Sequence, residues 1–398
     1  NRAGGGTPIA NTDNSGTMTY VRIEFAGGGA VGETEVHGLV LNSTGSQTTM
    51  NHIQISESGQ DGLKMIGGRT DLKEVYVLDA RGKGLNLAYG NLSKMQTVLI
   101  QQKDAAANLA SGTYGFYAIN NDANPGYQPF TNFTASNVGI LGIKYCNPSA
   151  TVSSNFLDGF YFDHNVKGNV YNTTVFGMNR YGLYINDQAS AVNTANNDLN
   201  VAYSSFTGNT SADYAQGAFT WSGNGCSSSM ANWLSPGTGC REAGNQFSGF
   251  DPAYNSSFCA SFCENFSQQF VLDAANTELD APNYTASVLS SFTALDYRGA
   301  VMDNDLYTPW VHVCPKNVSY CSANKMKASD QYGMLHFFPN PAQNFTVVRF
   351  DATLPGAGTL VVLDRLGGKV YHQQAVSIDK PGQQSLRISL AGLRPDVY

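Results

Sequence analysis

Two segments of the chain place a carboxylate next to a histidine or an amide, directly after a short apolar run. Asp163 and His164 follow Phe-Tyr-Phe, and Asn186 and Asp187 follow Leu-Tyr-Ile, a step of 186 − 163 = 23 residues. If the two segments are successive turns of one repeat, Asp163 lies beside Asn186 and His164 beside Asp187. A histidine beside a carboxylate can act as a general base, so Asp163, His164 and Asp187 are the catalytic candidates. The alternative, which we favour, is a hydrogen-bonded ladder of polar side chains that closes a turn.

Three tyrosines occupy one position of the same pattern. Tyr117, Tyr161 and Tyr184 each stand between two apolar residues of such a run, so in a strand their side chains point away from the core. On successive turns they would form an exposed row. Such a row suits contact with sugar rings or a protein surface, because tyrosine has an apolar face and a polar tip. The alternative is that the segments at 120–150 and 190–240 fold over the row and bury it.

Oxygen ligands for a hard cation gather in two places. Residues 303–305 read Asp-Asn-Asp and residues 196–198 read Asn-Asn-Asp. Neither segment has the ligand count of a calcium loop, and solvated turn residues are the alternative. We therefore predict no metal site and no cofactor, with Ca²⁺ as the one candidate ion.

The cysteines are concentrated in one region. Six of the seven lie within residues 226–321, whereas Cys146 stands alone. No histidine or second cysteine pair stands at zinc-finger spacing from Cys259 and Cys263, so we favour disulfides over a metal site. The nearest-neighbour pairs that we predict are Cys226–Cys240, Cys259–Cys263 and Cys314–Cys321. Disulfides would indicate an oxidising, extracytoplasmic compartment.

All of these residues need a repeating scaffold, and the apolar residues predict one. Pairs of the form apolar–x–apolar recur in two series, with steps such as 75 − 53 = 22 and 183 − 160 = 23 residues. The first series is Val21/Ile23, Ile53/Ile55, Val75/Val77 and Val98/Ile100, and the second is Leu39/Leu41, Leu63/Met65, Leu85/Leu87, Phe116/Ala118, Phe160/Phe162 and Leu183/Ile185. Each period thus holds two short strands and glycine-containing turns, with almost no helix, unlike a leucine-rich repeat. The pattern predicts an all-β fold, a right-handed parallel β-helix over residues 1–321, with the apolar pairs in its lumen.

A family resemblance supports this fold. The segment DNSGTMTYVRIEFAGG at residues 13–28, followed by DGLKMIGG, resembles secreted bacterial β-helix proteins of the pectin-lyase-like superfamily. The segment DYRGAVMDNDLYTPWVHV at 296–313 is similar to the closing segment of that group. The resemblance implies further rungs before residue 1, because similar proteins begin with them.

Polysaccharide-cleaving members of the superfamily carry motifs that this sequence lacks. The hydrolases resemble polygalacturonases, whose Asp-Asp pair, Gly-His-Gly and Arg-Ile-Lys do not occur in this chain. Glycoside hydrolysis needs two carboxylates held on either side of the bond, and no matching motifs supply them. We therefore expect a binding or structural module. A polysaccharide lyase or glycoside hydrolase with a divergent active site is the alternative.

The chain changes character near residue 335. Residues 335–398 hold six Lys or Arg and four Asp, net +2, whereas the remainder has 17 − 26 = −9. Alternating strands at 344–350, 359–364, 370–376 and 385–390 predict a small Ig-like β-sandwich, joined by a polar linker at 322–334.

This second segment resembles the C-terminal sorting domain of the type IX secretion system. The matching residues are Phe338, Pro339, Asn340, Pro341, Asp364, Gly367, Val370 and Leu393. Asp396 stands where such domains have glycine, and their last strand would lie beyond Tyr398. The resemblance implies recognition by an outer-membrane translocon and secretion or display on the cell surface, and an ordinary appended sandwich is the alternative. Pro339 and Pro341 lack backbone donors, so we expect the strand there to start at a sheet edge.

Composition limits the partners. The net charge of −7 argues against nucleic acid, whose binding proteins usually carry a basic face. No apolar run approaches the roughly 20 residues of a membrane-spanning helix. The expected partners are the translocon and either a polysaccharide or a surface protein.

Overall fold

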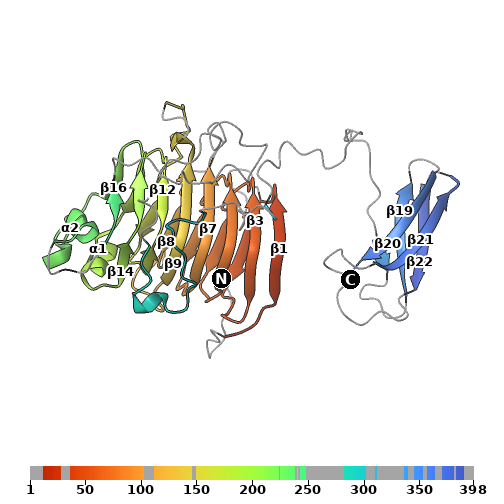
Figure 1. Ribbon diagram of the computed structural model, residues 1–398, viewed down its shortest axis with the longest axis horizontal. Helices are drawn as coiled ribbons and strands as arrows, with labels where there is room; N and C mark the ends of the chain where they lie inside the picture. The colour runs from red at the N-terminus through yellow and green to blue at the C-terminus, as the bar shows by residue number, and fades with distance from the viewer. Residues whose placement is uncertain are drawn as a thin grey trace. The chain divides into compact units, whose positions relative to one another are not determined.

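The computed structural model describes residues 12–27, 36–102, 112–145, 149–223, 225–237, 240, 243–247, 282–301, 310–311, 336–338, 345–352, 356–363, 370–380 and 382–389. The chain forms two compact units, Asn1–Val318 and Ser319–Tyr398. The first unit is a stack of parallel strands, and the second holds the antiparallel strands (Figure 1).

One sheet of the first unit runs through every coil of the stack. Its strands follow the order β1-β3-β5-β7-β9-β12-β15-β17, with β11 between β9 and β14, and every pairing is parallel. They are β1 (Thr17–Glu24), β3 (Thr49–Ser56), β5 (Leu72–Leu78), β7 (Lys94–Gln102), β9 (Asn132–Gly142), β11 (Lys167–Tyr171), β12 (Thr174–Phe176), β14 (Leu199–Ala202), β15 (Ser205–Thr207) and β17 (Gln246–Phe247). Val21, Ile53, Val75 and Val98 are register partners in turn, which confirms the first predicted series.

A second sheet, in the order β16-β13-β10-β8-β6-β4-β2, closes the coil opposite the first. Its strands are β2 (Leu39–Asn42), β4 (Leu63–Ile66), β6 (Leu85–Ala88), β8 (Phe116–Ile119), β10 (Phe160–Asp163), β13 (Tyr181–Ile185) and β16 (Ala212–Gln216). Leu39, Leu63, Leu85, Phe116, Phe160 and Leu183 are register partners in turn, so the second predicted series is also confirmed. The fold is a parallel β-helix.

The lumen between the sheets is the hydrophobic core. Leu63 and Leu85, whose inward direction tests the register, are both 0% exposed and pack in one cluster with Ile55 and Leu87. Each fully buried aliphatic side chain of this kind contributes roughly 1.5–3 kcal/mol through removal from water. One coil of the β-helix, or rung, gains this stabilisation only when a neighbouring rung covers its apolar side chains. The apolar pattern must therefore repeat.

A column of glycines marks the point where the chain enters each strand of the second sheet. A Cβ on Gly62 would lie 2.5 Å from Val77 Cγ1 and 2.8 Å from the carbonyl oxygen of Gly84. A Cβ on Gly84 would lie 2.4 Å from Ile100 Cγ2 and 2.7 Å from the carbonyl oxygen of Gly115. The close approach of backbone to lumen requires glycine here, and this accounts for the glycine that recurs before successive strands, as in Asp61-Gly62, Lys83-Gly84 and Tyr114-Gly115.

The first sheet bends at a column of left-handed residues. Tyr20, His52, Glu74, Thr97, Asn137, Asn172 and Tyr203 all have φ between 51° and 56°. The bend divides β9, which pairs with β11 before Asn137 and with β12 after it. Asparagine tolerates this conformation better than most residues. The bend turns the side chains of Asn137 and Asn172 away from the lumen, toward a later segment of the chain.

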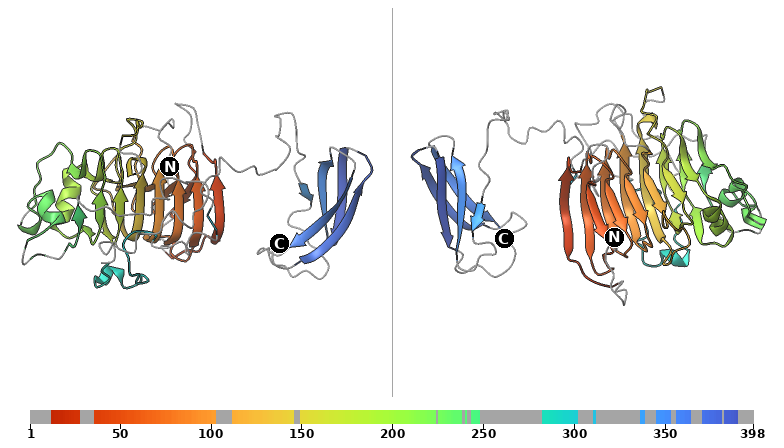
Figure 2. Two further views of the ribbon diagram at one scale, coloured as in Figure 1. Left: turned by 45° about the horizontal axis from the view of Figure 1, so that its top comes forward. Right: turned by 180° about the vertical axis from the view of Figure 1, so that it is seen from behind.

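That later segment, residues 282–301, lies on the outside of the solenoid (Figure 2) and is called the strap below. Asn172 donates from Nδ2 to the carbonyl oxygen of Asn283 (3.1 Å) and accepts from the N–H of Asn283 (2.7 Å). Gln96 pairs in the same way with Thr293, at 2.6 Å and 3.0 Å. The strap contains the 3-10 turn Ser287–Leu289, and it returns to the bend where the N–H of Gly299 donates to Asn172 O. The β-helix predicted over residues 1–321 therefore does not extend through the strap, which forms no strand.

Two α-helices lie at the end of the stack opposite β1 (Figure 1), where almost no helix was predicted. Helix α1 (Gln188–Ala195) starts after Asp187, and α2 (Met230–Leu234) starts after Ser229; each cap side chain accepts backbone N–H groups. Besides the turn in the strap, the described residues of this unit contain the 3-10 turns η1 (Ile143–Tyr145) and η2 (Gly225–Ser227). Within the described ranges, no helix has the length and apolar character to cross a membrane.

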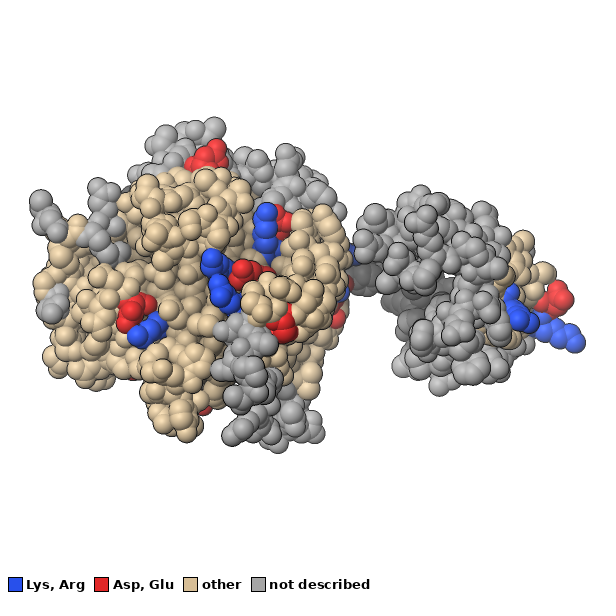
Figure 3. Space-filling view, turned by 90° about the horizontal axis from the view of Figure 1, so that it is seen from below, with Lys and Arg blue, Asp and Glu red and all other residues tan. Residues whose placement is uncertain are grey.

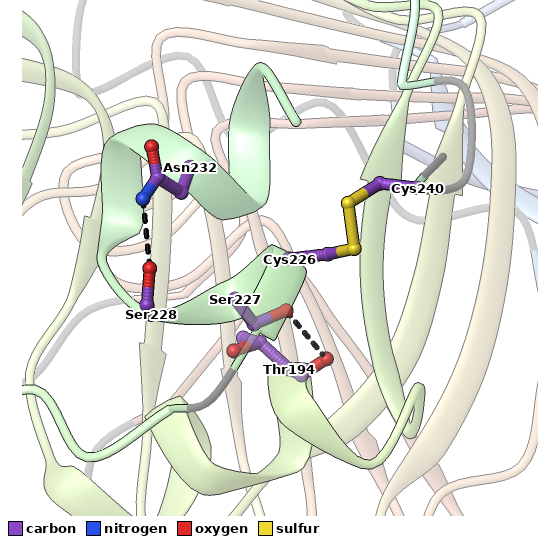
Figure 4. Close-up of a disulfide and its surroundings, with 6 residues drawn as sticks. All are labelled: Thr194, Cys226, Ser227, Ser228, Asn232 and Cys240. Carbon is purple, nitrogen blue, oxygen red and sulfur yellow. Dashed lines mark hydrogen bonds between the residues drawn. A yellow bond between two sulfur atoms is a disulfide. The ribbon is translucent and has the colours of Figure 1, made fainter. Parts of the chain in front are cut away.

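A disulfide joins η2 to the chain beyond α2. Cys226 and Cys240 are bonded with their Cα atoms 5.7 Å apart, as predicted (Figure 4). Ser227 Oγ donates to Thr194 O at 3.4 Å, which ties the cross-linked turn to α1. The other predicted pairs, Cys259–Cys263 and Cys314–Cys321, and the single Cys146 lie outside the described residues.

The second unit consists of antiparallel strands, close to the predicted ones. They are β18 (His336–Phe338), β19 (Phe345–Ala352), β20 (Gly356–Leu363), β21 (Val370–Ile378) and β22 (Gly382–Ser389), arranged as β18-β19-β22 and β20-β21. Pro339 and Pro341 fall between β18 and β19. The expected edge position holds for β18 but not for β19, which is the central strand of its sheet. Of the motif residues, Pro339, Asn340, Pro341, Asp364, Gly367 and Leu393 lie outside the described residues.

Candidate functional site

The three predicted tyrosines stand side by side on the outer face of the second sheet. Tyr117, Tyr161 and Tyr184 are register partners on β8, β10 and β13. Their rings stack with centroids 5.2 Å apart between the first two and 5.6 Å between the last two. Tyr117 and Tyr184 are partly exposed, and Tyr161 between them is 9% exposed. The predicted row therefore exists, with its middle member buried.

Two further tyrosines enlarge the row. Tyr114 lies 4.4 Å from Tyr161 and 5.5 Å from Tyr117, and Tyr181 lies 5.3 Å from Tyr184. Both stand directly before a glycine of the glycine column, and sequence reasoning missed them. The signal was present, because Tyr114-Gly115 and Tyr181-Gly182 occupy the same place in the repeat. We call the five residues Tyr114, Tyr117, Tyr161, Tyr181 and Tyr184 the tyrosine face.

The stacking decides what the tyrosine face can offer a ligand. Neighbouring strands lie about 4.7–4.9 Å apart, which is less than the width of a phenol ring, so the rings cannot lie flat side by side. The planes of Tyr117 and Tyr161 are 13° from parallel, and those of Tyr181 and Tyr184 are 6° from parallel, so each ring covers part of its neighbour. The row thus presents ring edges and hydroxyl groups. The ring faces that would stack on a sugar are turned toward neighbouring tyrosines.

An arginine anchors one end of the face. Arg180 donates from Nε and Nη2 to Asp158, at 2.8 Å and 2.5 Å, and the N–H of Tyr181 donates to the same carboxylate at 3.1 Å. The guanidinium lies 4.6 Å from the centre of the Tyr184 ring. Burial raises the pKa of Asp158 even though Arg180 and Tyr181 oppose this, and the hydrogen bond to Asp158 raises the pKa of Arg180. The pair holds the arginine over the tyrosines.

The other polar groups form a ladder beside the row. Asp163 accepts from Asn186 Nδ2 at 2.7 Å and from the hydroxyl of Tyr161 at 3.3 Å. At the opposite end of the strands, Asp61 precedes β4 and accepts at 2.7 Å from Nδ2 of Asn86, the register partner of Tyr117. The predicted neighbours Asp163 and Asn186 are therefore bonded to each other across the rungs.

The hydroxyls of Tyr114, Tyr117 and Tyr161 stay neutral at neutral pH because their pKa values are raised. Burial, followed by the charge of Asp158, raises the pKa of Tyr114 to about 12. Burial and then Asp163 raise the pKa of Tyr117 and of Tyr161 still further. At neutral pH the hydroxyls of Tyr114 and Tyr117 can both donate and accept a hydrogen bond, whereas the Tyr161 hydroxyl already donates to Asp163.

Of the three catalytic candidates, Asp163 and His164 lie against each other, whereas Asp187 serves as a helix cap. Asp187 accepts from the N–H groups of Ala189 and Asn165, so its carboxylate caps α1 and holds a turn. His164 lies 3.3 Å from Asp163 Oδ2 and 3.5 Å from Asp122 Oδ1, and its backbone has a φ of 54°. The hydrogen bond between Asn186 and Asp163 and the cap formed by Asp187 are contacts of the kind expected for a polar ladder that closes a turn.

The metal candidates can be followed in part. Asp198 forms an ion pair with Lys167 at 2.7 Å, and Asn196 is the C-cap of α1. Residues 303–305 lie outside the described residues. Across the part of the chain that the structure describes, no three His, Cys, Asp or Glu side chains are grouped so as to hold a metal ion.

Charge is sparse on the molecule as well as at the site. Figure 3 shows one face of the solenoid, where the few charged side chains lie among uncharged ones and mostly beside a charge of opposite sign. This fits the charged content of 13% over the whole chain.

Comparison with known proteins agrees with the fold. The family model described as a pectate-lyase-like β-helix domain matches residues 3–241, which is more than half of the chain. Comparison with curated proteins and with solved structures finds no match. The matched residues include all the strands of the second sheet and the whole tyrosine face. The chain therefore belongs to the pectate-lyase-like β-helix family.

Proposed function

We propose that this protein is an exported binding module and that its tyrosine face takes a glycan. The observation that carries the proposal is the stack of Tyr117, Tyr161 and Tyr184 in register across three rungs. A glycan chain is a linear array of hydroxyl groups, and the face offers a linear array of neutral hydroxyls with Arg180 at one end.

Binding is a better account of the site than cleavage. Glycoside hydrolysis needs two carboxylates free to act on the substrate. Asp158 is engaged by Arg180, Asp163 by Asn186 and Tyr161, and Asp187 by backbone N–H groups. Carboxylates with these partners are suited to holding the face in shape.

The test is a binding screen of the full chain against a panel of soluble polysaccharides. Tyr117→Phe and Tyr184→Phe keep the stacked ring and remove the hydroxyl, so each should weaken binding about fivefold, the value of one hydrogen bond near 1 kcal/mol. Tyr20→Phe is the matched control, because Tyr20 is 64% exposed on β1, outside the tyrosine face. Equal affinity in all four proteins would remove the tyrosine face from the proposal. New reducing ends or unsaturated uronides in the same mixtures would establish the enzymatic alternative.

We propose in addition that the second unit directs export through the type IX secretion route to the cell surface or medium. Its antiparallel strands β18–β22, the motif from Phe338 onward and its opposite charge balance support this. The Cys226–Cys240 disulfide supports an oxidising compartment. Deleting residues 335–398 should leave the solenoid folded and trap it in the periplasm. Undiminished secretion or display of the shortened protein would reduce the unit to an ordinary appended domain.

A further inference from the structure

The charges around the tyrosine face indicate which glycans it accepts. The ionisable side chains beside Tyr114, Tyr117, Tyr161 and Tyr184 include the carboxylates of Asp61, Asp122, Asp158 and Asp163, the cations Lys83 and Arg180, and His164, which lies 3.3 Å from Asp163 Oδ2 and 3.5 Å from Asp122 Oδ1. With the histidine counted as neutral, their formal charge is 2 − 4 = −2. An acidic glycan brings one carboxylate with each uronic acid, and this face would repel it.

Neither cation is placed to receive a row of carboxylates. Arg180 already donates hydrogen bonds from Nε and Nη2 to Asp158, whose side chain is 0% exposed. Lys83 Nζ lies 5.3 Å from the centre of the Tyr117 ring. A polyuronate lying across three rungs needs a cation for each sugar. Because Arg180 is bonded to Asp158, the pair of cations named above leaves Lys83 alone for this role.

The carboxylates are equally unsuited to a cationic glycan. Asp61 and Asp163 are 3% and 6% exposed and accept from Asn86 and Asn186 respectively. Only Asp122 reaches solvent, with a side chain 68% exposed. Engaged, buried acceptors cannot rotate to meet an ammonium group on each sugar.

We propose that the ligand of the tyrosine face is an uncharged glycan, bound by hydrogen bonds between its hydroxyls and those of the tyrosines. This inference rests on the proposed glycan-binding function and narrows it. Acidic polymers such as polygalacturonate are excluded by charge, and amino-sugar polymers by the lack of accessible carboxylates.

The experiment compares four probes on the full chain: galactomannan and mixed-linkage β-glucan as neutral polymers, polygalacturonate as an anion and chitosan as a cation. Affinities are measured between about 0.02 M and about 0.3 M NaCl, a range that shortens the Debye length several-fold. The expected result is binding of a neutral polymer with a Kd that changes less than about twofold over this range. Binding of polygalacturonate or chitosan in preference, with affinity falling steeply as salt rises, overturns the inference while leaving the proposed function standing. Absence of binding to any polysaccharide defeats the proposed function itself.

A charge variant separates the two outcomes further. Asp122→Lys reverses the one well-exposed charge near the face. With an anionic ligand it should tighten binding about fivefold, the upper value for an exposed ion pair. With an uncharged ligand the Kd of the variant should stay within about twofold of the wild-type Kd. If the variant instead binds polygalacturonate at the tyrosine face more than about twofold more tightly than the wild type does, the inference is contradicted.

Discussion

Replacing Arg180 by alanine should destabilise the solenoid more than any exposed substitution, because it leaves a buried carboxylate without its cation. Asp158 has a fully buried side chain and accepts two hydrogen bonds from Arg180 at 2.8 Å and 2.5 Å. Removing one partner of a buried ion pair costs about 3–5 kcal/mol, and because the Arg180 side chain is 30% exposed we expect about 3 kcal/mol. The unit Asn1–Val318 has an unfolding entropy of about 0.7 kcal/mol/K by the average per residue, so this loss is a fall in Tm of roughly 4–5 °C.

The pH dependence of the variant has a definite sign. Burial already raises the pKa of Asp158 in the folded protein, and loss of Arg180 raises it further. A carboxyl whose folded pKa exceeds its unfolded value destabilises the protein at neutral pH, and this cost is relieved as pH falls through the folded pKa. The difference in stability between Arg180→Ala and the wild type should therefore shrink on acidification, until the pH approaches the unfolded value of about 3.9.

The assay is thermal unfolding followed by circular dichroism at pH 7 and at acidic pH. The double variant Asp158→Asn/Arg180→Ala is the control, because it removes the buried charge together with its partner and should recover at least about 1 kcal/mol relative to Arg180→Ala. If the double variant is no more stable than Arg180→Ala, and the loss does not vary with pH, the destabilisation does not come from the buried charge.

Three other predictions concern the scaffold. Gly84→Ala should lower the free energy of unfolding by about 1–3 kcal/mol through overpacking. Gly237→Ala is the control, because its added Cβ meets nothing within 4 Å and should leave Tm nearly unchanged. Equal Tm values for the two variants would show that the lumen can relax around the added methyl group. Replacing Cys226 and Cys240 by serine should lower the free energy of unfolding by about 3 kcal/mol, the chain-entropy value for the loop that this disulfide closes. Denaturant unfolding without reductant measures the change, and a loss below about 1 kcal/mol would contradict the prediction. Gln96→Ala removes both hydrogen bonds to the strap backbone at Thr293, so amide hydrogen exchange near residue 293 should accelerate, and unchanged exchange would mean that other contacts hold the strap.

The sequence predicted the register of both sheets because each lumen residue meets the same surroundings in every rung. A single apolar pair such as Leu63/Met65 is ambiguous, but its recurrence with one period fixes which side chains point inward. The position of the tyrosines followed directly from that register. Their orientation did not, because the spacing of strands forces neighbouring rings to overlap, and this appears only when ring size is compared with strand separation.

The repeat pattern did not predict three other features: the Arg180–Asp158 ion pair, the strap and helix α1. Each has its own physical reason. Arg180 and Asp158 sit in turns, where no apolar period marks them, and they meet only because their rungs are adjacent. The strap pairs Thr293 with Gln96 across 197 residues, and no local pattern encodes such a contact. Helix α1 was not predicted, although Asp187 followed by an alanine-rich stretch is a readable N-cap signal, because Asp187 was interpreted as a catalytic candidate or as part of a polar ladder.

The strap also changes how the solenoid must fold and unfold. A stack of coils is nearly one-dimensional, so each rung is stabilised by its neighbours alone and the ends can fray independently. The strap adds contacts that skip along the stack, from β7 at Gln96 to β15 at Ser205, where Arg298 donates at 3.1 Å. These contacts raise the average sequence separation of interacting residues, which slows folding, and they couple rungs that would otherwise open one at a time. The middle of the β-helix therefore gains its full cooperativity only after the chain up to residue 299 has been made and has returned across the rungs it passed.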